Sequence, residues 1–225
     1  MPSSHQHLVH GTKLFTDGAI GSRTAAIEKE YRGGGGNGLL LYADEALSNE
    51  LRKCFDFAKP VAVHAIGNRA IEQTIRILER DFANVANSVR MEHLQFVSRD
   101  LAARAQKLGV QFCMQPNFSD DSRHYADRLP IGYPEANNPF RMLIDEAGFQ
   151  TGVELLLGSD GMPHGVVEAV RQSLFPVHDG QRLSMDELIA GYCMSNLEMG
   201  SIELTIDETG KSVSAQVRPA TVSAD

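Results

Sequence analysis

The sequence lacks the features of a membrane-spanning or secreted chain. No apolar run approaches the roughly 18 residues that a membrane-spanning helix requires, and the segment Met1–Ser4 does not open a signal-peptide pattern. The three cysteines, Cys54, Cys113 and Cys193, are odd in number and far apart. That usage is typical of buried thiols in a reducing compartment. We therefore expect a cytoplasmic protein whose thiols are buried. A reactive Cys113 is the lesser alternative to a buried one.

The sequence also lacks a cluster of basic residues. Its formal net charge is −8 over 225 residues, which argues against nucleic acid or an anionic membrane surface as the main partner. It contains no G-x-x-x-x-G-K-[ST] motif and no suitably placed G-x-G-x-x-G motif. What it does contain is 42% hydrophobic residues, enough for the core of one large domain or a small two-part chain.

Three short apolar runs predict buried strands, and each of them leads to a side chain that can bind a metal ion. These are His64 after residues 61–63, His93 near the end of residues 88–97, and Asp160 after residues 155–157. In α/β proteins the carboxyl ends of the strands carry the chemistry. Imidazole nitrogen and carboxylate oxygen suit zinc and related divalent ions. A single such histidine could equally be a core residue, but three successive strand ends favour a metal site.

The rest of the chain alternates strands with helices and then changes period. The segment Gly11–Ala19 predicts a further strand, which contains Lys13. The predicted helices cover residues 43–58, 68–80, 100–108, 119–128, 139–147, 166–174 and 184–194. Residues 201–206 and 212–217 alternate as a β-hairpin does. We therefore expect an α/β chain with a tail (1–10), a β/α part (11–197) and a hairpin with a second tail (198–225).

Four segments read T-K-L-F-T-D-G-A-I-G-S-R-T-A, V-H-A-I-G-N-R-A, R-M-E-H-L-Q and L-G-S-D-G-M-P. In this order they resemble motifs of the amidohydrolase superfamily, and most closely its family 3 branch, which is related to N-substituted formamide deformylases. The resemblance implies a (β/α)8 TIM barrel that carries a small β-sandwich. Because the chain offers only about five strands and a closed barrel needs eight, we expect part of a barrel, with the hairpin as a remnant of the sandwich.

The same resemblance implies a metal-dependent hydrolase that cleaves a C–N bond in an amide, formamide or cyclic amide. Carried over, Lys13 matches a carboxylated lysine, His64 and His93 match two histidine ligands, and Asp160 matches an aspartate ligand. The set would hold one or two ions, zinc or another divalent metal. The ions would lower the pKa of a shared water, and Asp160 would pass the proton of that water to the leaving nitrogen.

Loops that follow the strands supply the predicted substrate contacts, because such loops commonly shape active sites. Arg23 lies in the loop 20–37, and Asn117 follows the strand 110–114. We assign substrate binding to these two residues. Specificity would lie in the same loops, so the sequence does not name the substrate.

Other positions depart from the family pattern. The family carries an H-x-H pair on its first strand, whereas His5 and His7 stand only a few residues before the Lys13 strand, so we do not assign them that role. Asn68 stands where aspartate is usual, and Phe118 near a common histidine. Two rival hypotheses follow: an incomplete relic that binds at most one ion and acts as an association module, and an α/β domain without metal.

Two further expectations concern strand geometry. Glu92 precedes His93 in its strand, so alternation predicts that it faces away from the site and pairs with Arg90 or a helix residue. Five strands of an unclosed barrel leave two bare edges and an uncovered apolar interior. We therefore expect a homo-oligomer, or association with the missing N-terminal half of a barrel.

Overall fold

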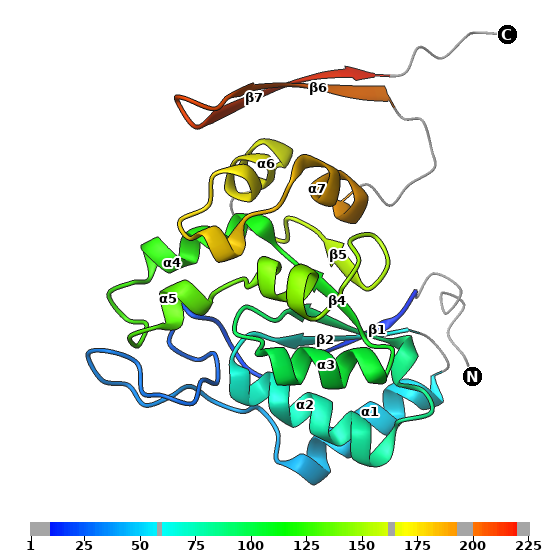
Figure 1. Cartoon of the computed structure of the whole chain (residues 1–225). Coiled ribbons are helices and arrows are strands. Elements are labelled where there is room, and N and C mark those ends of the chain that lie inside the picture. Colours follow the sequence, from blue (N-terminus) through cyan, green and yellow to red (C-terminus); the bar gives the residue numbers. More distant parts are fainter. Residues whose placement is uncertain (1–9, 58–59, 162–164, 193–199, 220–225) are drawn as a thin grey trace, which may run out of the picture.

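The computed structural model describes residues 10–57, 60–161, 165–192 and 200–219, and its centre is one parallel sheet (Figure 1). The five strands lie in chain order and each pairs in parallel with the next. They are β1 (Thr12–Phe15), β2 (Val61–Ala65), β3 (Val89–His93), β4 (Gln111–Met114) and β5 (Leu155–Leu157). The fold is therefore α/β, with the five β/α strands expected of a partial barrel. The tail with His5 and His7, and also Cys193, lie outside the described residues.

Helices cover one face of this sheet. The first three are α1 (Asp44–Asp56), α2 (Asn68–Asp81) and α3 (Arg99–Lys107), which lie together below the strands in Figure 1. Val63, Met91 and Phe112 point from the strands into the core on this side, and all three are buried. The helices bury their apolar stripes against them, as the 3.6-residue spacing predicts.

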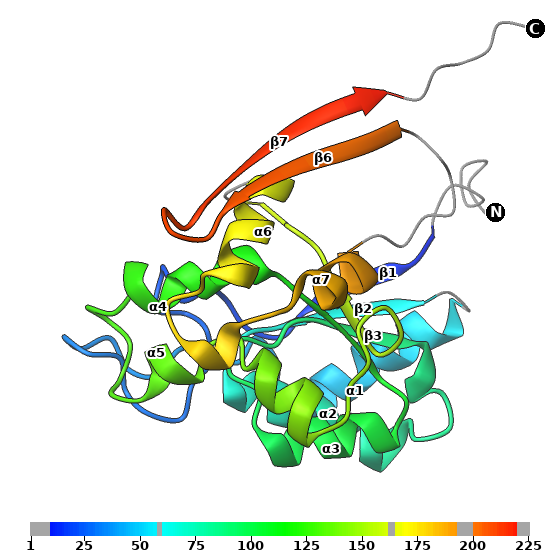
Figure 2. The ribbon, with the colours of Figure 1, turned by 45° about the horizontal axis from the view of Figure 1, so that its top comes forward.

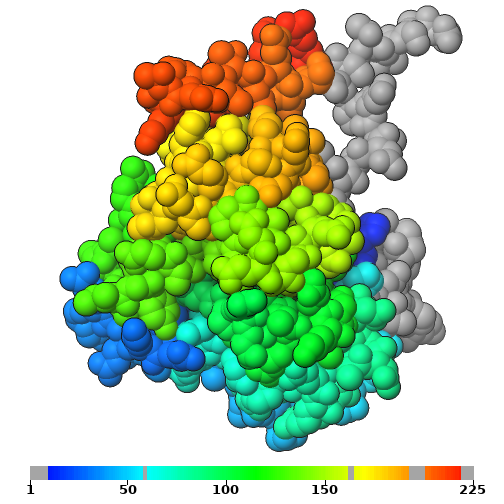
Figure 3. Space-filling model, in the orientation of Figure 1, coloured from blue at the N-terminus to red at the C-terminus, as the bar shows by residue number. Residues whose placement is uncertain are grey.

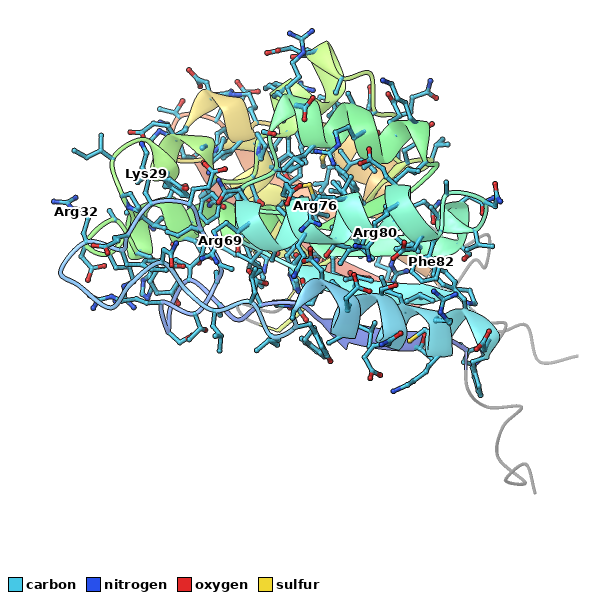
Figure 4. All side chains as sticks on the ribbon, turned by 90° about the horizontal axis from the view of Figure 1, so that it is seen from below. Lys29, Arg32, Arg69, Arg76, Arg80 and Phe82 are labelled. Carbon is cyan, nitrogen blue, oxygen red and sulfur yellow. The ribbon has the colours of Figure 1, made fainter. Side chains whose placement is uncertain are left out.

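Ion pairs tie the outer surfaces of α1 and α2 to each other. The Arg76 guanidinium lies 2.7 Å from the Asp44 carboxylate, and Arg80 lies 3.2 Å from Glu45 (Figure 4). Hydrogen bonds from Arg76 and Gln73 lower the pKa of Asp44 to about 2. These exposed pairs contribute little to stability, so the apolar interface holds the two helices together.

The remaining helical segments are short. They are η2 (Ala86–Ser88), η3 (Pro116–Asp120), α4 (Asp121–His124), α5 (Tyr133–Ala136), η4 (Met142–Glu146), α6 (Val166–Leu174), η5 (Asp179–Gln181) and α7 (Met185–Tyr192). The predicted helix 119–128 is thus split into two short turns, and the predicted helix 139–147 contains a π-helical turn. Ser184 and Glu187 form the predicted capping box of α7, with both reciprocal hydrogen bonds present.

The C-terminal hairpin lies apart from the sheet. Its strands β6 (Gly200–Asp207) and β7 (Ser212–Pro219) pair antiparallel along their whole length. Helices α6 and α7 lie between the hairpin and the sheet in Figures 1 and 2, and Figure 3 shows the same stacking from the outside. No helix of the described residues is long and apolar enough to cross a membrane.

The face of the sheet opposite α1–α3 is open toward the starts of β1 to β4, whereas His64 and Glu92 further along the same face are buried. Cross-strand register places Lys13, Ala62, Arg90 and Gln111 in one row across this face, and all of these except Ala62 are exposed. Phe15, one pleat further along, is 48% exposed. Parallel sheets are normally covered on both faces. In a closed barrel this face would be the packed interior, so its exposure is the structural consequence of having five strands.

The two faces predict different costs for matched substitutions. Phe112 is fully buried and stacks on Phe149 with ring centroids 4.7 Å apart, so Phe112→Ala should lower the free energy of unfolding by about 3–5 kcal/mol. Phe15→Ala on the open face should cost about 1 kcal/mol or less. Urea denaturation measures both, and equal losses would show that the open face is covered in solution.

Candidate functional site

Two histidines and an aspartate meet at the carboxyl edge of the sheet. His64 lies near the end of β2, His93 ends β3, and Asp160 follows β5. The imidazole centroids of His64 and His93 are 4.6 Å apart with the rings nearly perpendicular. The Asp160 carboxylate lies 4.0 Å from Nδ1 of His93. The histidines are 8% and 5% exposed, whereas the Asp160 side chain is 49% exposed. The structure thus brings together three of the residues predicted from the sequence.

An unusual backbone conformation directs His93 to this place. His93 and Leu94 both have positive φ angles, 76° and 47°, which residues other than glycine rarely adopt. The amide of Leu94 donates to the carbonyl of Ala65 at 3.0 Å, which anchors the turn to β2. Alternation along β3 therefore stops at Glu92, and the His93 ring can reach His64.

The expected orientation of Glu92 is wrong for the same reason. Glu92 pairs in register with His64, and parallel partners share a face, so Glu92 lies on the side of His64 and not away from it. Its predicted partner is confirmed, because Nε of Arg90 donates to Glu92 at 2.7 Å. Burial, followed by the Glu92 charge, raises the pKa of the neighbouring Cys113 thiol to about 12. A raised pKa favours the protonated thiol at neutral pH, which argues against the reactive-cysteine alternative for Cys113.

His64 is held by a carboxylate that sequence analysis missed. Nε2 of His64 lies 3.0 Å from the Gly18 carbonyl and 3.3 Å from Oδ1 of Asp17. The Asp17 carboxylate is buried, and it accepts backbone N–H bonds from Ala26, Ile66 and Gly67 at 2.8–3.0 Å. It therefore joins the loop after β1 to the end of β2.

The glycines of the same segments permit this close approach. A Cβ atom on Gly67 would lie 2.0 Å from the Ala26 carbonyl oxygen, and a Cβ atom on Gly18 would lie 2.0 Å from Oγ1 of Thr24. A larger residue at either position would force the facing atoms to move. Both glycines are visible in the sequence, in the segments T-D-G and I-G-N. Their spacing, however, does not indicate that the Asp17 carboxylate joins the two segments.

His93 is held by an amide on the opposite side of the pair. Its Nδ1 lies 2.8 Å from Oε1 of Gln115, which is buried. Asn138 in turn donates to the Gln115 carbonyl at 2.9 Å. Burial, and then the neighbouring His64, lowers the pKa of His93. The imidazole of His93 is therefore neutral near neutral pH, as a metal ligand must be.

The remaining predicted residues lie differently. Lys13 is on the face of His64 but one pleat earlier, with its Nζ 5.1 Å from the Phe15 ring centre. Lys13 is exposed, so these five strands do not provide the burial that we expected to favour a carbamate. Arg23 donates to the Gly34 carbonyl at 3.4 Å inside its own loop. Asn117 is buried and donates to the Ser159 carbonyl at 2.9 Å, so it holds the turn that carries Asp160.

The donor types fit a divalent metal ion, but the set is not complete. Two buried imidazoles and a nearby carboxylate are ligands that zinc prefers. Within the described ranges, however, no three side chains of His, Cys, Asp or Glu approach closely enough to hold an ion. A metal site built on His64 and His93 would therefore need further ligands, from movement of Asp160, from Lys13, or from elements outside the described chain.

A network of buried amides supports the site from the loops after β3 and β4. Gln95 donates to Asp121 at 2.9 Å and to Asn137 at 3.0 Å. Gln181 donates to Ser122 and to the Asn137 carbonyl at 2.8 and 2.9 Å. Within this network, burial raises the pKa of Asp121 to about 6, and the hydrogen bond from Gln95 and the His124 charge only partly oppose the rise.

Comparison with known proteins places the chain in a family. A family model described as "Amidohydrolase family" matches residues 2–171. Because this match covers more than half of the 225 residues, the chain belongs to the amidohydrolase family. Its five-stranded sheet accordingly corresponds to part of an amidohydrolase TIM barrel.

Individual relatives are longer than this chain. The protein named "Putative amidohydrolase YtcJ" from Bacillus subtilis is 34% identical over 119 residues, which make up 52% of this chain and 22% of that protein. An uncharacterized metal-dependent hydrolase from Pyrococcus horikoshii is 27% identical with a TM-score of 0.60, over 72% of this chain and 32% of that one. A similarly described hydrolase from Pyrococcus furiosus has a TM-score of 0.65 at 23% identity, over 79% and 37%. The chain thus spans about a fifth of the curated relatives and about a third of the solved structures that it matches.

The pKa of Asp121 predicts a specific pH dependence of stability. Folding raises this pKa from 3.8 to about 6, so the folded chain binds the proton more tightly, and stability falls as pH rises between these two values. Asp121→Asn removes the penalty and should raise the free energy of unfolding by on the order of 2 kcal/mol near pH 7 and hardly at all near pH 4.

Denaturant titrations at both pH values test this prediction. Asp179→Asn is the matched control, because the Asp179 side chain is 96% exposed and its substitution should change stability little at either pH. A gain for Asp121→Asn that was the same at both pH values would contradict the assignment.

Proposed function

We propose that this chain is the metal-binding part of an amidohydrolase that cleaves a C–N bond in an amide, formamide or cyclic amide. The observation that carries the proposal is the convergence of His64, His93 and Asp160 at the carboxyl ends of parallel strands, in a chain of the amidohydrolase family. The names of the Pyrococcus structures, which call them metal-dependent hydrolases, support the metal requirement.

Each residue has a role that its chemistry supports. His64 and His93 would hold a divalent metal ion such as zinc through neutral imidazoles, and a Lys13 carbamate would add an anionic oxygen. When bound, the ion polarises the scissile carbonyl and lowers the pKa of water toward 7. The exposed Asp160 carboxylate would accept the proton of the attacking water and return it to the leaving nitrogen. Arg23 and Asn117 remain predicted substrate contacts.

We further propose that other strands complete the site. The open face of the sheet carries Lys13 and Phe15 next to His64, and additional β/α units would bury it. These units would be the N-terminal half of a barrel or, alternatively, a second copy of this chain. Covering the face would also bury Lys13, which a carbamate requires.

A second candidate function rests on the incompleteness of the ligand set. No group of three suitable side chains is close enough to hold an ion within the part of the chain that the structure describes, and Lys13 is exposed. A relic that binds at most one ion weakly, and that acts as an association module, would show these features. Metal stoichiometry and turnover distinguish the two functions.

The histidines give the first prediction for this function. His64→Ala or His93→Ala should weaken zinc binding at least about 10-fold, because each removes one imidazole ligand. Equilibrium dialysis with metal analysis measures the affinity. His124→Ala, which removes an exposed histidine of α4, is the matched control and should bind as the unmodified chain does.

The same preparations distinguish the candidates by turnover. Tightly bound zinc together with chelator-sensitive hydrolysis of N-formyl or cyclic amide substrates supports the amidohydrolase. One weakly bound ion without turnover supports the relic. Unchanged zinc binding in both histidine variants would refute the proposed metal site.

A further inference from the structure

The hydrogen bonds of His64 identify which of its ring nitrogens carries the proton. Nε2 lies 3.0 Å from the Gly18 carbonyl and 3.3 Å from the Asp17 carboxylate. A backbone carbonyl can only accept, and the two oxygens of Asp17 already accept N–H bonds from the backbone as a carboxylate does. Nε2 of His64 must therefore be the donor. In the neutral ring this leaves Nδ1 without a proton.

The hydrogen bonds of His93 have the opposite arrangement. Its Nδ1 lies 2.8 Å from Oε1 of Gln115. The Gln115 amide is oriented by its other end, because Nε2 donates to the Cys113 carbonyl at 3.3 Å. Exchanging the oxygen and nitrogen of this amide would place two oxygens against each other, so Oε1 must face His93. Nδ1 of His93 is then the donor, and Nε2 lacks a proton.

We propose that Asp17 and Gln115 are positioning residues that hold the paired histidines in opposite tautomers, so that Nδ1 of His64 and Nε2 of His93 are the two nitrogens free to bind a ligand. Where that ligand is a metal ion, the inference rests on the function proposed above. The tautomers themselves are a property of the chain without metal.

Both positioning groups are built into the fold. Asp17 is buried and bonded to three backbone amides from two separate segments, so its position does not depend on His64. Gln115 is buried, and its backbone carbonyl accepts from Asn138, whose own amide donates to the Gln95 carbonyl. Residues fixed in this way hold each imidazole in one orientation before anything binds to it. Binding then costs no further conformational entropy for ordering the ring.

Gln115 is also placed to offset the strain at the end of β3. The positive φ angles of His93 and Leu94 are strained for residues other than glycine and persist only when the surroundings fix them. The hydrogen bond from His93 to Gln115 is one such contact. Losing it should therefore free the imidazole to change both its tautomer and its orientation.

The test uses the full chain without metal, with ¹⁵N-labelled histidine, near pH 8, above the ordinary histidine pKa of about 6.5. Long-range ¹H–¹⁵N correlation spectra should show a proton on Nε2 of His64 and on Nδ1 of His93. Gln115→Met keeps the length of the side chain but accepts no N–H bond of this kind, so His93 should become a mixture of tautomers while His64 is unchanged. Gln115→Glu keeps an oxygen acceptor at His93 and should retain the Nδ1 proton, although its second oxygen no longer donates to the Cys113 carbonyl.

Zinc affinity provides the second readout. Gln115→Met should weaken zinc binding about 10-fold to 100-fold. Gln115→Glu, which keeps the acceptor at His93 but loses the donor to the Cys113 carbonyl, should weaken it less, provided that melting curves show both variants folded. The role of Asp17 is tested through the His64 tautomer in the unmodified chain. A substitution of Asp17 would also remove the acceptor of three backbone N–H groups.

The outcomes separate the two proposals. A proton on Nε2 of His93 in the unmodified chain, or an unchanged spectrum in Gln115→Met, would overturn the positioning role even if zinc binds. The expected tautomers in a chain that binds no zinc would support the positioning role and refute the metal-dependent function.

Discussion

The hydrogen-bonded pairing of five parallel strands brings the carboxyl ends of β2, β3 and β5 to one edge of the sheet. Everything else in the site depends on this pairing, because His64 and Asp160 are far apart in the sequence and meet only through it. Parallel register also decides the neighbours of each residue, as the row from Phe15 through His64 to Glu92 shows. The loops then adjust the directions of the side chains.

Two buried acceptors make this adjustment. Asp17 and Gln115 lie on opposite sides of the histidine pair, and each contacts one imidazole nitrogen. Because a carboxylate bonded to backbone amides cannot move without breaking several hydrogen bonds, the loop after β1 is part of the site although it need not touch a substrate. A network of this kind stabilises a defined geometry only when all its members are satisfied. Glycine at positions 18 and 67 leaves room for this packing, because a Cβ atom at either position would lie 2.0 Å from an atom of the facing loop.

Much of this arrangement could be predicted from the sequence. Apolar runs bounded by proline or glycine predicted β2 and β5, and the pairing of Ser184 with Glu187 predicted the start of α7. The convergence of His64 and His93 followed from strand order alone. The role of Asp17 could not be predicted. It accepts hydrogen bonds from the backbone N–H groups of Ala26, Ile66 and Gly67, and residue types do not show which backbone groups a side chain will contact. The side of Glu92 was predicted wrongly, because alternation assumes extended backbone and His93 is not extended. The exposure of Lys13 depends on strands outside this sheet.

The central claim is that His64 and His93 present two free nitrogens to one metal site at the carboxyl edge of the sheet. Anomalous X-ray diffraction from zinc-soaked crystals, recorded on both sides of the zinc absorption edge, tests it most directly. The account predicts an anomalous peak in contact with Nδ1 of His64 or Nε2 of His93, at about the 2.0–2.1 Å of a zinc–nitrogen bond. Zinc bound elsewhere on the chain, with both imidazoles still bonded only to Asp17, Gly18 and Gln115, would contradict it.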